Sequence, residues 1–209
     1  MRLVATTFVM RSDPAARSLG CAEADRPFDH AFQLIPYGDD DIGKIITQNL
    51  MRAGAFLLGW RTFDAVSKNW QQIVQHNPVA AAYSQLPKYI VSTRPRDCAG
   101  ATNINGDITD AVAELKERPG LELQVYGSTR LSRALMDLGL VDEYRLLIYP
   151  LSLCGAQPSS DLMMSPAGLP LSTVTTTSGG IVSLTYCEPR KTSGYSMAAL
   201  RHPNLAVVG

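Results

Sequence analysis

Two segments of the sequence pass from an apolar run through a glycine into residues that carry hydroxyl and guanidinium groups. They are Leu57-Leu58-Gly59-Trp60-Arg61-Thr62-Phe63 and Val125-Tyr126-Gly127-Ser128-Thr129-Arg130-Leu131. Each is typical of a buried strand that turns at the glycine and opens a helix. The first turn of a helix has unpaired N–H groups and a partial positive charge, so it binds phosphate. Two such junctions suit a pyrophosphate, although either one alone is more typical of an ordinary turn with a capping Ser or Thr.

A third segment, Ser92-Thr93-Arg94, follows the apolar run that ends at Val91 and is itself followed by Pro95. It leaves a predicted strand with two hydroxyls and one fixed positive charge. Such a group suits a 2′-phosphate, the feature that distinguishes NADP from NAD. The common glycine-rich loops for dinucleotides and nucleoside triphosphates are absent from the sequence, as is the nucleophile elbow of hydrolases.

The composition is that of a globular protein, with 45% hydrophobic and 18% charged residues among 209. There are 19 Lys and Arg residues and 19 Asp and Glu residues, so the formal net charge is zero. A neutral chain has no electrostatic footprint for a phosphate backbone, and nucleic acid is not expected as a partner. No apolar run approaches the roughly 20 residues of a membrane helix, so we expect no membrane association.

The four cysteines lie far apart and form no C-x-x-C pair, and the three histidines supply no close ligand pairs. The sequence therefore predicts no metal site. The apolar start of the chain is broken by Thr6 and Thr7 and lacks a cleavage site of small residues, so it predicts a first strand rather than a signal peptide. Reduced thiols in a cytoplasmic protein are the expected state.

The elements that must position these residues alternate between strands and helices. Strands are predicted over 3–10, 55–58, 88–92, 102–104, 121–126 and 141–149. Helices are predicted from 39 to about 54, over 62–68, from 108 to 118, and after Gly127. Residues 171–177 and 181–187 predict a hairpin around Ser178-Gly179-Gly180. Residues 11–38, 71–87 and 151–170 are interpreted as loops and 188–209 as a tail.

This order predicts one α/β domain over 1–187, with a mainly parallel sheet, helices on both faces and antiparallel strands at one edge. Four motifs then resemble those of the dihydrofolate reductase-like superfamily, above all the bacterial proteins related to the reductase domain of riboflavin biosynthesis. They lie at 57–63, 87–92, 125–131 and 140–146, the last followed by Pro150. The resemblance implies a three-layer fold with a mixed, mostly parallel sheet of about eight strands.

The resemblance also implies an NADPH-dependent reductase of a small heterocyclic, imine or carbonyl substrate; relatives of this type often form homodimers. By position, residues expected to contact the adenosine diphosphate part are Gly59, Trp60, Arg61 and Thr62. Those for the 2′-phosphate are Ser92, Thr93 and Arg94, and those for the pyrophosphate are Gly127, Ser128, Thr129, Arg130 and Leu131. The backbone near Thr6 and Thr7 would face the nicotinamide carboxamide, and Tyr126 would stack on or hydrogen-bond to a ring.

The sequence departs from the family pattern at several points. Trp60 stands where the pattern has an arginine, for which Arg61 is the expected substitute. The segments Met10–Pro14 and Leu153–Ala156 replace two further motifs, and Gly43 aligns with the carboxylate of true dihydrofolate reductases, so folate is not the expected substrate. These departures favour a second hypothesis, a non-redox enzyme or small-molecule-binding protein with a degraded cofactor cleft. A flavin-using variant is a third.

Hydride transfer to a C=N or C=O bond also requires a proton. Two carboxylates are candidate donors. Asp13 belongs to the first loop, where it is equally typical of a turn residue before Pro14. Asp41 belongs to the acidic triplet at the start of a helix, where an acid that caps the helix is the more common role.

Overall fold

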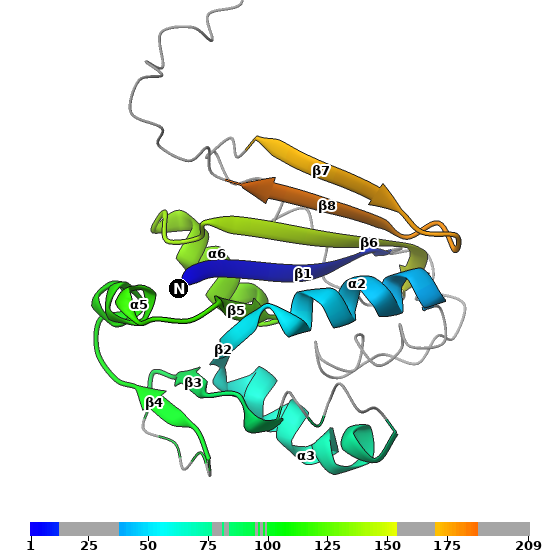
Figure 1. Cartoon of the computed structure of the whole chain (residues 1–209). Helices are drawn as coiled ribbons and strands as arrows, with labels where there is room; N and C mark the ends of the chain where they lie inside the picture. The colour runs from blue at the N-terminus through cyan, green and yellow to red at the C-terminus, as the bar shows by residue number, and fades with distance from the viewer. Residues whose placement is uncertain are drawn as a thin grey trace, which may run out of the picture.

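The computed structural model describes residues 1–12, 38–76, 81, 84–94, 96, 98, 100–153 and 170–187. The strands are β1 Arg2–Ser12, β2 Ala53–Gly59, β3 Lys88–Val91, β4 Thr102–Ile104, β5 Glu122–Tyr126, β6 Glu143–Leu153, β7 Leu171–Thr176 and β8 Val182–Cys187. The helices are α2 Asp40–Met51, α3 Trp60–His76, α5 Ile108–Glu117 and α6 Thr129–Asp137. Figure 1 shows how these elements are arranged.

The strands of this part of the chain form one eight-stranded sheet in the order β4-β3-β2-β5-β1-β6-β8-β7. Pairing is parallel from β4 to β6 and antiparallel from β6 to β7. The predicted mixed sheet with an antiparallel hairpin at one edge is therefore confirmed. No helix among the described residues is long and apolar enough to cross a membrane.

Helices cover both faces of the sheet, which gives the predicted three layers (Figure 1). On one face, Val112 of α5 and Leu135 of α6 pack into the main apolar cluster. On the other, Leu50 of α2 and Phe63 of α3 pack against β2 and β3. The strand β2 contributes to both clusters and is nearly all apolar, as a parallel strand covered on both faces must be.

The neighbouring strands β2 and β5 send their following helices to opposite faces. The helix α3 returns the chain from β2 to β3 on the face that carries Phe63, whereas α6 carries it from β5 across β1 to β6 on the face that carries Leu131 and Leu135. In parallel α/β sheets, such a divergence opens a crevice at the carboxyl ends of the two strands. Gly59 ends β2 and Gly127 directly follows β5, so both lie where this crevice is expected.

Two predicted boundaries were wrong. The helix predicted over 62–68 begins at Trp60 and extends to His76, because no glycine or proline interrupts the chain before Pro78. The strand predicted to end at 149 continues through Pro150 to Leu153. Pro150 falls in a register shift between β1 and β6, where no ladder hydrogen bond requires its missing N–H group.

The acidic residues at the start of α2 bind the β7–β8 hairpin turn. Asp39 accepts hydrogen bonds from the N–H groups of Ile42 at 2.7 Å and Gly179 at 2.6 Å. Asp41 accepts from the Ser178 hydroxyl at 3.0 Å and from Lys44 at 3.0 Å. The hydrogen bond with the Thr177 side chain and those from Ile42 and Gly179 lower the pKa of Asp39. The side chains of Lys44 and Ser178 do the same for Asp41.

We predict that Asp39→Asn lowers the melting temperature at pH 7, because a charged acceptor at the helix start and turn is lost. The folded pKa of Asp39 lies below its ordinary value of 3.8, so its stabilisation is present above that pH and is lost as the pH falls through the folded pKa. Thermal unfolding from pH 7 to pH 3 should show the difference from wild type shrinking below pH 4. The control is Asp40→Asn, whose side chain makes no hydrogen bond to the hairpin. A difference that stays constant with pH would contradict this account.

Candidate functional site

The two predicted glycine junctions lie against each other at the crevice between β2 and β5. The hydroxyl of Ser128 accepts a hydrogen bond from the Gly59 N–H at 2.9 Å and donates one to Thr62 Oγ1 at 2.7 Å. A Cβ atom on Gly59 would lie 3.2 Å from Ser128 Oγ, so only glycine allows this approach without a shift. One hydroxyl thus joins the starts of α3 and α6.

The backbone at the start of α6 is left-handed at two consecutive residues. Gly127 has φ +59° and Ser128 has φ 49°; Ser128 is the one non-glycine residue with positive φ in the described part of the chain. A serine in this conformation costs about 1–2 kcal/mol. The hydrogen bonds to Gly59 and Thr62 offset that cost, and the strain marks a place where geometry is under local constraint.

The first turn of α6 receives no hydrogen bond from a capping side chain. Ser128 occupies the N-cap position, but its side chain makes no capping hydrogen bond because it is directed to Gly59 and Thr62. The N–H groups that a capping side chain normally satisfies are therefore available to a ligand. Together with the helix dipole, they favour an anion at this position.

The third predicted segment follows β3, the strand beside β2, at the same edge of the sheet. Val91, the last residue of β3, pairs with Gly59, so Ser92-Thr93-Arg94 begins beside the start of α3. The Ser92 hydroxyl accepts a hydrogen bond from the Arg94 N–H at 3.3 Å, which shapes the turn that presents Arg94. All three segments expected to contact phosphate groups thus follow the carboxyl ends of adjacent strands.

Arg96 is a cation at this edge that the sequence analysis missed. Its guanidinium carbon lies 4.9 Å from the centroid of the Trp60 ring, and Trp60 also packs at 6.1 Å against Phe63. The signal in the sequence is the spacing Arg94-Pro95-Arg96, which gives no hint that Trp60 is the partner. Trp60 is thus half-buried and holds a guanidinium, where the family pattern has an arginine in the helix itself.

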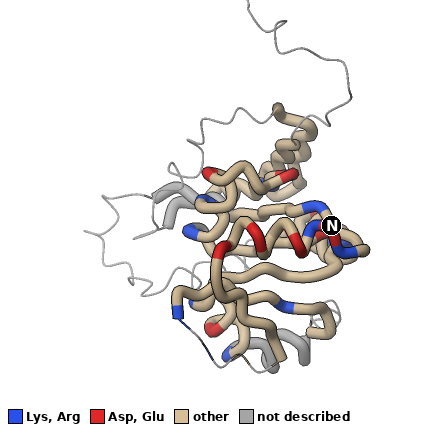
Figure 2. The backbone as a smooth tube through the Cα atoms, turned by 90° about the vertical axis from the view of Figure 1, so that its left-hand side faces the viewer, with Lys and Arg blue, Asp and Glu red and all other residues tan. Residues whose placement is uncertain are grey.

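Exposed arginines surround the crevice without carboxylate partners. Four exposed guanidinium groups lie on the three segments and beside them, and within the described chain none forms an ion pair: Arg61, Arg94, Arg96 and Arg130. Figure 2 shows that elsewhere acidic and basic positions are interspersed along the tube. This edge therefore offers uncompensated positive charge to an anionic ligand.

Thr6 and Tyr126 lie on the α2 side of the sheet, where they are register partners on β1 and β5. Thr6 is fully buried, and its Oγ1 has no hydrogen-bond partner among the described residues. Burial raises the pKa of Tyr126 to about 12, so its hydroxyl is neutral at physiological pH. Thr7 points to the other face, where its Oγ1 accepts a hydrogen bond from Tyr144 at 3.1 Å.

The other predicted site residues have structural roles or lie outside the described residues. The Leu131 side chain is 8% exposed and packs in the main core, so only its backbone faces the first turn of α6. The hydrogen bonds that lower the pKa of Asp41 keep it ionised and bound to the hairpin, which makes it a poor proton donor at neutral pH. Asp13 lies outside the described residues, as does Cys154. The described residues include no group of three or more His, Cys, Asp or Glu positioned to hold a metal ion.

Comparison with known proteins agrees with this architecture. Residues 37–183, well over half of the chain, match the RibD C-terminal domain. The chain belongs to the RibD C-terminal domain family. It is also 30% identical over 156 residues to the uncharacterized protein YyaP of Bacillus subtilis (strain 168), an alignment that covers 71% of this chain and 80% of YyaP.

Solved structures show that the fold is that of the RibD C-terminal domain, the dihydrofolate reductase-like fold expected from the motifs. A putative riboflavin biosynthesis protein from Shewanella sp. PV-4 superposes with a TM-score of 0.55 at 15% identity, covering 91% of this chain and all of that one. A pyrimidine reductase-like protein from Corynebacterium diphtheriae gives 0.53 at 16% identity, covering 90% and 92%. At such low identity, these likenesses concern the fold alone.

We predict that Ser128→Ala destabilises the protein by about 1–2 kcal/mol, because two hydrogen bonds are lost while the left-handed backbone is kept. Ser128→Gly should be less destabilising, since glycine adopts positive φ without strain. Urea unfolding of both variants measures the difference, with exposed Ser67→Ala as the control. An equal loss of stability in the two variants would show that Ser128 is not strained.

Proposed function

We propose that this protein is an NADPH-dependent reductase that transfers hydride to a small heterocyclic, imine or carbonyl substrate. The proposal rests chiefly on one observation: three phosphate-type segments meet at a crevice whose cations have no carboxylate partner among the described residues. Membership of the RibD C-terminal domain family and a structural neighbour named as pyrimidine reductase-like support it. The redox chemistry would come from the nicotinamide, which supplies the hydride.

The residues of the crevice fit such a cofactor. The backbone N–H groups at Gly127–Arg130 suit the pyrophosphate, because Gly127 leaves room for close approach and Ser128 leaves the first turn uncapped. Arg94, with Ser92, suits a 2′-phosphate. Arg96 on Trp60 adds a planar cation beside the adenosine position, and Arg130 adds charge at the pyrophosphate.

On the substrate side, we propose that Thr6 and Tyr126 orient the reacting group. Both side chains lie on the α2 face, Tyr126 at the end of β5 and Thr6 beside it within β1. A neutral Tyr126 hydroxyl and the unpartnered Thr6 hydroxyl are donors to a carbonyl oxygen or imine nitrogen. An acceptor-bearing, uncharged ring is therefore a better fit than a cationic amine.

Arginine variants should separate the two phosphate positions. Arg94→Ala is expected to weaken NADPH binding by about 1–2 kcal/mol, roughly 5- to 30-fold, with little effect on NADH, because only NADPH has the 2′-phosphate. Arg130→Ala should weaken both cofactors by a similar factor. Calorimetric titration provides the measurement, and Arg133→Ala is the control because Arg133 pairs with Asp137 at 3.0 Å on the same helix. Unchanged NADPH affinity in both variants would contradict the assignment.

Turnover distinguishes this reductase from a binding protein on the same scaffold. Loss of NADPH absorbance with a panel of oxo-heterocycles, cyclic imines and small carbonyl compounds would support the reductase. Tight NADPH binding without turnover of any class would favour the non-redox alternative. We propose a cytoplasmic location, which fits a pyridine nucleotide and the thiol of Cys187.

We further propose a homodimer. The edge strand β7 is exposed along its whole length, carries no charged residue, and presents Leu171 and Val174 at 50% and 54% exposure. An uncharged open edge of this kind tends to pair with another strand. Sedimentation equilibrium should give twice the chain mass for the wild type and the monomer mass for Val174→Lys. A monomeric wild type would rule the dimer out.

A further inference from the structure

A cavity lies on the α2 side of the sheet, toward the amino end of β6. It has a volume of about 330 Å³ and lies between the C-terminal half of α2 and the strands β6, β8 and β7. The residues of β6 that border it, Glu143 and Arg145, are at the amino end of that strand, whereas the crevice is at the carboxyl ends. A volume of this size is in the range of small-ligand sites.

One wall of this cavity consists of hydroxyl side chains. Thr173 pairs with Thr185, and Thr175 pairs with Ser183, so these four side chains share one face of the β7–β8 hairpin. Thr185 in turn pairs with Arg145, which continues the same face onto β6. A register shift between Leu171 and Thr173 adds the Ser172 hydroxyl to the lining. The wall therefore offers hydrogen-bond donors and acceptors without charge.

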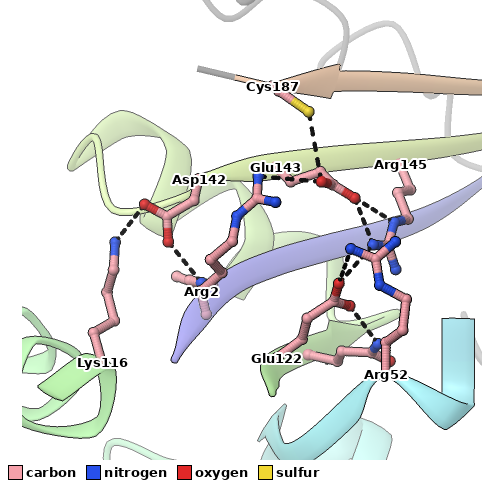
Figure 3. Close-up of polar contacts among 10 residues, drawn as sticks. Arg2, Arg52, Lys116, Glu122, Asp142, Glu143, Arg145 and Cys187 are labelled. Carbon is pink, nitrogen blue, oxygen red and sulfur yellow. Dashed lines mark hydrogen bonds and ion pairs between the residues drawn. The ribbon is translucent and has the colours of Figure 1, made fainter. Parts of the chain in front are cut away.

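The charged residues that line the cavity, Arg52, Glu143 and Arg145, belong to a larger ion-pair cluster that also contains Arg2 and Glu122. Figure 3 shows the carboxylates of Glu122 and Glu143 among three guanidinium groups. Arg145 binds Glu143 through Nε at 2.6 Å and Glu122 through Nη2 at 3.0 Å. Arg52 binds Glu122 at 2.6 Å and Arg2 binds Glu143 at 3.2 Å. Two carboxylates face three arginines, which leaves one positive charge uncompensated.

Two buried polar atoms of this cluster and its neighbour Gln124 have no hydrogen-bond partner among the described residues: Arg145 Nη1, a donor, and Gln124 Oε1, an acceptor. Arg145 is only 3% exposed, and its Nη1 is buried with no hydrogen-bond partner among the described residues. An N–H donor left without an acceptor in a buried site is costly, more so when it is charged. Because Arg145 also lines the cavity, an acceptor bound there could satisfy it.

The C-terminus of α2 also borders the cavity, and its carbonyl groups would oppose an anion. The Asn49 carbonyl, however, accepts hydrogen bonds from the Arg52 N–H at 3.1 Å and from Gln124 Nε2 at 2.6 Å. Arg52 lies at the helix end with its side chain 54% exposed, so a second guanidinium stands at the mouth. These contacts thus offset the partial negative charge at the C-terminus of α2, where a ligand would enter the cavity.

We propose that this cavity is a binding site for a small oxyanion, a phosphate or carboxylate group, held by the guanidinium groups of Arg145 and Arg52 and by the hydroxyls of Thr173 and Thr185. The site shares no residue with the proposed cofactor crevice, but Arg145 is the register partner of Thr6, which we propose orients the substrate. Anion binding in this cavity can be tested whether or not the protein binds NADPH.

The test measures the rise in melting temperature with sodium phosphate against sodium chloride at equal ionic strength. It is carried out in the Arg94→Ala/Arg130→Ala background, so that the crevice contributes little phosphate binding. Sodium acetate is the second probe: a response to acetate alone assigns a carboxylate site, and a response to phosphate alone a phosphate site. A saturable rise with either probe is the expected result.

Thr173→Val/Thr185→Val should reduce the phosphate- or acetate-dependent shift at least twofold, because the hydroxyls are lost while the side-chain shape and strand preference are kept. Thr176→Val is the matched control, since Thr176 pairs with Val182 on the opposite face of β7. Arg145 is left intact because its removal would leave Glu122 and Glu143 without their shared partner. No shift with either anion, or an equal shift in the double variant, would overturn the proposal.

Discussion

The hydroxyl of Ser128 is the contact on which the geometry of the crevice depends. It joins the two helix starts through hydrogen bonds with the Gly59 N–H and Thr62 Oγ1. The strands β2 and β5 would diverge at this point in any sheet of this topology, because their helices leave toward opposite faces. Because the Ser128 hydroxyl is used there, it makes no capping hydrogen bond in the first turn of α6. The same atom thus joins the two helix starts and leaves N–H groups of α6 for the proposed anion site.

Arginine side chains differ in burial and in carboxylate pairing at the two ends of the sheet. At the carboxyl ends, guanidinium groups are exposed and have no carboxylate within the described chain, so their field is available to a ligand. At the amino ends, Arg145 is buried and shares Glu122 and Glu143 with two further arginines. Hydrogen bonds and charge from these carboxylates outweigh burial and raise the pKa of Arg145. The buried cluster fixes β1, β5 and β6 in register, and β1 and β5 end beside the crevice.

Much of the fold could be predicted because its signals are local. Apolar runs that end at Gly59 and Gly127 predict buried strands followed by helices, and the sheet confirms both. The length of α3 was missed because polar residues after Lys68 were interpreted as a loop. The passage of β6 through Pro150 depends on a register shift with β1, which no local pattern encodes. Tertiary pairing decided the end of β6, whereas α3 continues because no glycine or proline interrupts the chain before Pro78.

The candidate site could be predicted as a set of segments but not as a mechanism. Backbone features such as the uncapped α6 turn follow from one side chain that reaches a residue 69 positions away. The stacking of Arg96 on Trp60 and the burial of Arg145 likewise join distant segments. Asp41 illustrates the converse, because its partner Ser178 lies 137 positions away and gives the carboxylate a structural contact.

The most direct test of the proposed cofactor site is a crystal structure of the protein with bound NADPH. We expect pyrophosphate oxygens within hydrogen-bond distance of the N–H groups at Gly127–Arg130, with the 2′-phosphate beside Arg94. A cofactor bound elsewhere, with the opening between Gly59 and Gly127 empty, would contradict it.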